Sequence, residues 1–162
     1  MMADGVNFKI EGLAALKGKL AEISDDLRRK SGRAALRKAG NVIVSKAKAN
    51  AQRLDDPETG RSIADNVTMR WNSKLFKRTG NLGFRIGVAH GAVLKKNPDK
   101  GVNAPTPHWR LLEFGTEKMR AQPFMRPAME SSVQEVVATF VTEYEKGIDR
   151  AIKRAQKKGV DP

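Results

Sequence analysis

The chain has no cysteine, one tyrosine, two histidines and comparatively few acidic residues. Without cysteine, disulfide bonds and thiolate metal sites are excluded. His90 and His108 do not form an i, i+4 pair, and neither lies beside a carboxylate cluster with zinc spacing, so we expect no metal site and no cofactor. Residues 1–8 lack the apolar core of a signal peptide, and the longest apolar run, near 136–141, is too short to span a bilayer.

Charge is the unusual feature that remains. Thirty-one Lys and Arg against eighteen Asp and Glu give a net charge of +13, which favours polyanionic partners or acidic protein surfaces. The length of 162 residues and a hydrophobic content of 40% are typical of one globular domain. We therefore expect a single domain over 1–162, with flexible ends at 1–5 and 157–162.

The first third of the chain alternates between strand and helix patterns. Val6, Phe8 and Ile10 have the period of two that predicts a short strand, and 13–23 carries an amphipathic helical pattern. A longer helix is expected after Ser24, because small and apolar residues recur on one stripe. That stripe consists of Leu27, Ala34, Leu36, Ala39, Ile43, Ala47 and Ala51. A turn cluster over 54–60 ends this helical region.

The middle of the chain predicts an antiparallel hairpin. Apolar residues alternate over 67–72 and again over 84–88, which indicates two strands with one buried face each. The basic segment 74–82 between them is expected to be a loop longer than the tightest hairpin turns. Residues 89–107 have little periodicity and several Gly or Pro breaks, so we expect a long loop that forms an arm or is ordered by a partner.

Residues 108–130 form what we call the clasp, a segment rich in aromatics with one glycine and two prolines. A short helix should end at Gly115, and an extended connection should lead to Pro123. A helix with Pro127 in its first turn should follow, and an unbroken helix over 124–156 would be about 50 Å long, so part of it should protrude or pack on a neighbour. Arg126 at a helix start needs a carboxylate partner, and Glu113 is the nearest choice, with a neighbouring subunit as the other.

Two parts of the clasp, LEFGT at 112–116 and QPFMRPAME at 122–130, together with Thr59 and Gly60, resemble a known family. They are similar to the tail-completion, or head-to-tail joining, neck proteins of long-tailed bacteriophages. The resemblance implies an α+β subunit, with a small antiparallel sheet and long hairpin packed against two long helices. It also implies a structural virion protein, made in the cytoplasm of a host bacterium, that is not an enzyme.

The resemblance further implies partners. Six copies would form a ring between the head-connector and the tail-tube or terminator proteins, and DNA would pass through it without sequence specificity. Expected structural or interface residues are those of the clasp: Trp109, Glu113, Phe114, Gly115, Thr116, Pro123, Phe124, Arg126 and Pro127. Candidate contacts to acidic partners or to DNA are Arg28, Arg29, Arg33, Arg37, Lys38, Lys74, Lys77 and Arg78. We expect the group on the helix to meet acidic proteins.

Two other functions stay open on the residues alone. The net charge also fits a free nucleic-acid-binding protein, although a charged helix face is more often simply solvated. Asp55, Asp56 and Glu58 resemble a magnesium-binding cluster of a nuclease, although beside Pro57 such residues more often form a turn. The sequence has no phosphate loop and no nucleophile elbow, which leaves the structural role as the first hypothesis.

Overall fold

A computed structural model describes residues 18, 24–54, 62–89, 106 and 108–157. The strand expected over 6–10, most of the helix over 13–23, nearly all of the turn over 54–60 and nearly all of the loop over 89–107 lie outside the described residues. So do Asp55, Asp56, Glu58 and both expected flexible ends, except that Lys157 is still helical.

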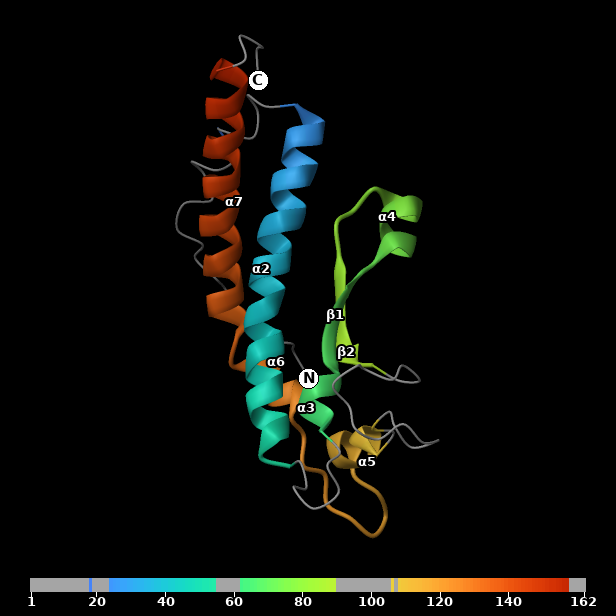
Figure 1. Cartoon of the computed structure of the whole chain (residues 1–162). Helices are drawn as coiled ribbons and strands as arrows, with labels where there is room; N and C mark the ends of the chain where they lie inside the picture. The colour runs from blue at the N-terminus through green and yellow to red at the C-terminus, as the bar shows by residue number, and fades with distance from the viewer. Residues whose placement is uncertain (1–17, 19–23, 55–61, 90–105, 107, 158–162) are drawn as a thin grey trace, which may run out of the picture.

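Two long helices form the frame of the molecule. Helix α2 (Asp25–Gln52) and helix α7 (Val133–Lys157) lie side by side and run in opposite directions (Figure 1). At 1.5 Å per residue they are about 42 and 37 Å long. The Tyr144 hydroxyl donates to the Arg28 carbonyl at 3.1 Å near one end, and Lys46 pairs with Glu135 at 2.8 Å near the other. These contacts hold the two helices together along most of their length.

Helix α2 begins after Ser24, as predicted, and its buried face is made of small residues. Gly32, Ala35, Ala39, Gly40, Ile43, Ala47 and Ala51 are buried on it. The expected stripe was wrong at Ala34, which is exposed, whereas Ala35 is buried. Helix α7 covers α2 on one side and other elements cover it on another, so the buried face of α2 is wider than a single stripe.

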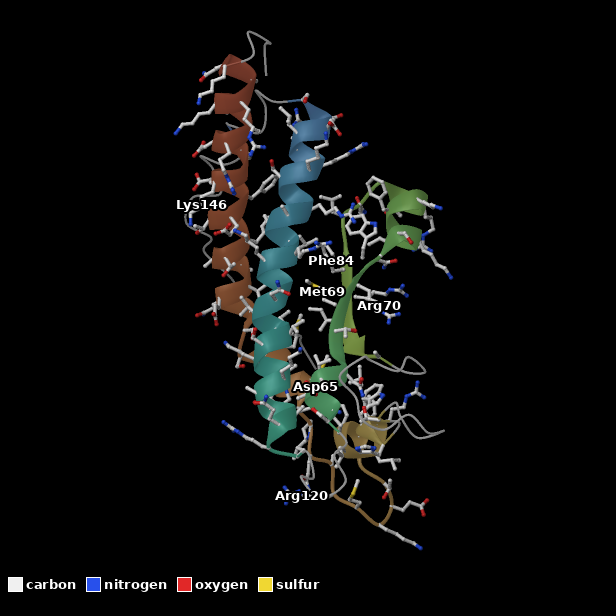
Figure 2. The ribbon with its side chains drawn as sticks, viewed as in Figure 1. Asp65, Met69, Arg70, Phe84, Arg120 and Lys146 are labelled. Atoms are coloured by element: carbon white, nitrogen blue, oxygen red, sulfur yellow. The ribbon has the colours of Figure 1, made fainter. Side chains whose placement is uncertain are left out.

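The predicted hairpin lies on the side of α2 opposite to α7 (Figure 1). Strands β1 (Val67–Trp71) and β2 (Phe84–Val88) pair antiparallel, with Val67 opposite Val88 and Trp71 opposite Phe84. This confirms both strands and their pairing. Figure 2 shows Met69 and Phe84 between the hairpin and α2, where Met69 packs against Gly40. A Cβ at Gly40 would lie 2.5 Å from the Met69 sulfur, so the glycine permits this close approach.

The connection between the strands differs from the expected loop. It contains helix α4 (Ser73–Thr79), which lies at the end of the hairpin where β1 connects to β2 (Figure 1). The Asn72 side chain caps it by accepting from the Leu75 N–H at 3.1 Å, and Gly80 ends it in the left-handed conformation. The sequence contains both the capping residue Asn72 and the terminating residue Gly80, but they enclose only two helical turns.

Three short helices gather at the other end of the hairpin. They are α3 (Ile63–Asn66), α5 (Trp109–Phe114) and α6 (Met125–Glu130). The main core lies here, where Ile63, Val67 and Phe124 pack against the small residues near the end of α2. A second cluster around Ile148 lies between the first half of α2 and α7.

The final helix is interrupted, against the expectation of one unbroken element. Helix α6 ends at Glu130, and α7 begins at Val133 after a turn at Ser131 and Ser132. The Ser132 hydroxyl donates to the Ala128 carbonyl, a local bond that competes with regular helix. The apolar stripe of α7 packs on α2, and Ile148 and Ile152 belong to the second cluster. The stripe is thus covered largely within the same chain.

Candidate functional site: the clasp and its groove

The centre of the clasp is a buried carboxylate. Glu113, at the end of α5, is 3% exposed. Its Oε2 accepts from the backbone N–H groups of Phe124 and Met125 at 2.8 and 2.9 Å, and its Oε1 accepts from that of Arg126 at 3.1 Å. These N–H groups open α6 and have no partner within the helix, so one carboxylate both satisfies them and complements the helix dipole.

The expected Glu113–Arg126 pair is present but secondary. The Arg126 Nε lies 3.9 Å from Glu113 Oε1, and the arginine is mostly exposed. Its guanidinium also lies over the Phe114 ring, 5.7 Å from the centroid. The three backbone bonds are shorter, and one of them is fully buried. Glu113 therefore fixes the start of α6, and Arg126 is an additional neighbour.

Gly115 ends α5, as predicted, but not in the left-handed helical conformation that we expected. Its φ is 75° and its ψ is −179°, a region that glycine alone adopts readily. A Cβ there would lie 2.8 Å from the Ala121 nitrogen. The connection beyond it folds back, since Thr116 accepts from the Met119 N–H at 3.0 Å and Gln122 donates to the Leu112 carbonyl at 2.7 Å.

The other clasp residues divide between core and surface. Phe124 is fully buried in the main core, and Trp109 packs against that core. Pro123 and Pro127 are exposed, with Pro127 in the first turn of α6 as predicted. Phe114 is 65% exposed and Leu111 is 49% exposed, so two large apolar side chains of α5 lie on the surface.

Beside the Glu113 cap lies an apolar groove of about 530 Å³. Its walls come from α2, β2, α5, α6 and the start of α7, including Leu36, Ile43, Ile86 and Val136. Phe114 and Met129 both line it and are 65% and 54% exposed. The clasp therefore presents a concave apolar surface lined in part by an exposed aromatic ring. Periodicity could not predict this groove, because residues from five elements form it.

The basic residues predicted on α2 are partly engaged within the chain. The Arg33 guanidinium lies 4.2 Å from the centroid of Trp71, and that of Arg37 lies 5.6 Å from the centroid of Phe84. These two arginines cover the hairpin aromatics. Their proposed contact with acidic partners therefore competes with an intramolecular role.

The remaining α2 cations differ from one another. Lys38 pairs with Glu143 of α7, and this hydrogen bond holds the pKa of Glu143 below its ordinary value. The Arg28 Nη1 lies 3.4 Å from the Asp25 Oδ1, so these two residues form an ion pair. Arg29 is exposed and makes none of these contacts with the described residues, so it is the member of the group best placed to meet another protein.

Two kinds of feature are absent among the described residues, metal-ligand clusters and membrane-spanning helices. No group of three or more His, Cys, Asp or Glu residues there could hold a metal ion. None of the helices in the same residues is long and apolar enough to cross a membrane.

The described residues thus form a two-helix frame, a small hairpin and a clasp with an open apolar groove. In a comparison with known families, residues 14–115 match the HK97-gp10-like family, whose description reads "Bacteriophage HK97-gp10, putative tail-component". The match covers more than half of the chain, and the chain belongs to this family of structural phage tail proteins. No curated protein and no solved structure matches it.

Proposed function

We propose that the chain is a tail-completion subunit of the phage neck. Copies of it form a ring around the DNA channel and join the tail tube to the head connector. Membership of a phage tail family supports a role in the virion, and the resemblance of the clasp to neck proteins supports this position, with six copies as the expected number. The groove of the clasp is the observation that carries the proposal.

The groove favours a second copy of the chain as its occupant. Exposed apolar surface that is concave and continuous marks a protein interaction site, and large buried aromatics supply much of the binding energy at such sites. Phe114 and Met129 line it with more than half of their surface in water. In a ring, this groove on one copy receives a different surface of the next, so each subunit has both halves of the contact.

Light scattering and negative-stain imaging of the purified full chain test the assembly. We expect rings for the natural sequence and folded single subunits for the double variant Phe114→Ser, Met129→Ser. The matched control is Leu111→Ser, which changes an exposed apolar residue of the same short helix that does not line the groove. Rings that persist in the double variant, or are lost equally in the control, would contradict the groove as the assembly surface.

The position in the neck needs a separate test in the phage or prophage that encodes the chain. When the double variant replaces the natural sequence, we expect full heads and complete tails that stay separate. Arg29→Glu is a second probe, because it reverses a charge on α2 without disturbing a contact described above. Virions that join normally although the subunit cannot assemble would place the protein elsewhere in the tail.

A further inference from the structure

The hairpin carries positive charge with no negative charge to offset it. Residues 67–88 include no Asp or Glu and five basic residues: Arg70, Lys74, Lys77, Arg78 and Arg85. All five are exposed. None of them takes part in an ion pair or a cation–π contact within the described part of the chain. They differ in this from Arg33, Arg37 and Lys38 on α2, whose charges have intramolecular neighbours.

Strand pairing brings two of these charges together. The register places Arg70 directly opposite Arg85. Side chains opposite each other on an antiparallel pair have Cβ atoms about 4.5 to 5.5 Å apart, and like charges in such positions repel. Figure 2 shows Arg70 on the side of the hairpin that points away from α2, whereas Met69 and Phe84 point towards it. The fold thus concentrates charge on the open face at a cost in stability, and a bound anion would remove that cost.

The surroundings of the arginine pair suit the close approach of a backbone. The next pair on the same face is Thr68 opposite Gly87, and a Cβ at Gly87 would meet nothing within 4 Å. Thr68, Gly87 and the two arginines line a shallow depression of about 250 Å³. Lys74, Lys77 and Arg78 add exposed positive charge on α4, at the tip of the hairpin.

We infer that this basic hairpin face binds the phosphate backbone of duplex DNA without reading its sequence. The inference rests on the proposed function, in which a ring of subunits surrounds DNA. The hairpin aromatics favour DNA over an acidic protein surface: Trp71 packs against Phe76 and Phe84 at ring distances of 5.6 and 5.2 Å, with Arg33 over it. The face therefore lacks the exposed aromatic anchors that protein interfaces use.

Salt dependence measures such contacts directly. Each phosphate neutralised by Lys or Arg contributes about −0.9 to the slope of log K against log salt, so five contacts predict a slope of about −4 to −5 for one subunit. Binding of the full chain to a fluorescent 30-base-pair duplex in a potassium chloride series gives this slope. Two duplexes of unrelated sequence should bind alike, since no base contact is involved.

The test variant is Arg70→Gln with Arg85→Gln, and the control is Lys153→Gln with Arg154→Gln. Lys153 and Arg154 are exposed near the end of α7, outside the hairpin. Both variants lose two charges, but only the first should reduce the magnitude of the slope, by about 2 per subunit. Its melting temperature should not fall, because a repulsive pair is removed. Unfolding therefore cannot explain the loss of binding.

Several results would overturn the inference. They are an unchanged slope in the hairpin variant, an equal loss in the control, and a hairpin variant that binds DNA normally but no longer attaches to the other neck or tail proteins. The last result would assign the face to an acidic protein.

Light scattering on the same samples separates the two proposals. Rings that show no salt-dependent binding to DNA would contradict only the DNA-binding face. Single subunits whose DNA binding depends on Arg70 and Arg85 would contradict only the ring.

Discussion

Replacing Glu113 with alanine tests whether one carboxylate holds the clasp together. The substitution removes the acceptor of three backbone N–H groups, of which that of Phe124 is buried and those of Met125 and Arg126 are partly buried. A hydrogen bond to a charged group contributes about 1.5 to 3 kcal/mol, and an orphaned buried donor adds its desolvation penalty. In the variant, water can hydrogen-bond the two partly buried N–H groups, so the three contributions do not add in full. We therefore expect the free energy of unfolding to fall by about 3 to 5 kcal/mol.

Two further variants distinguish the loss of the helix cap from the general effect of removing a glutamate side chain. Glu113→Gln keeps the shape and one acceptor oxygen but turns an NH2 group towards a backbone donor, so we expect an intermediate loss of about 1 to 3 kcal/mol. Glu130→Ala removes an exposed glutamate at the other end of α6 and should stay within about 0.5 kcal/mol of the natural chain.

Urea denaturation gives the free energies, and hydrogen exchange locates the effect. The amides of Phe124, Met125 and Arg126 should exchange faster in Glu113→Ala, whereas amides in the middle of α2 should lose only global protection. The reasoning is refuted if Glu113→Ala is within about 1 kcal/mol of Glu130→Ala, or if the three amides keep their natural protection relative to α2.

Three further predictions concern the core, the connection and the helix pair. Phe124→Ala should cost about 3 to 5 kcal/mol because the ring is fully buried, and a stable variant in urea would show that the clasp is not part of the core. Gly115→Ala should cost about 1 to 3 kcal/mol from backbone strain alone, measured in the same way, and a neutral result would rule out the extended positive-φ conformation. Burial raises the pKa of Tyr144, so the stability from its neutral form is complete below the unfolded pKa and lost as pH rises through the folded one. Since Tyr144 is the only tyrosine, absorbance at about 295 nm should titrate at higher pH in the folded than in the urea-unfolded chain, and coincident curves would contradict the burial.

Local patterns in the sequence determined much of the element order. The start of α2 after Ser24, the two strands and the end of α5 at Gly115 were predicted correctly. Each depends on residues within a few positions of one another, because a polar start before an apolar period, strand alternation and glycine termination are short-range signals. The family resemblance also came from short stretches of the clasp, and the match over 14–115 confirms that identification.

Helix boundaries that depend on competing local bonds were less predictable. The sequence predicts a loop over 74–82, whereas the structure has the two turns of α4 there, with Asn72 and Gly80 at their ends. The break at Ser131 and Ser132 was missed, because the Ser132 hydroxyl can compete with helix only once the preceding turn has formed.

Only the tertiary structure decided what the charged and aromatic residues do. Arg33 was predicted to contact an acidic partner protein, and its position over Trp71 requires the hairpin to fold back onto α2. Glu113 was expected to pair with the Arg126 side chain, which it does at 3.9 Å, but its shortest bonds come from three backbone N–H groups that converge when α6 meets α5. Sequence patterns report which residues share a face of one element. Contacts between elements depend on how several faces meet, and that is set by packing of the whole chain.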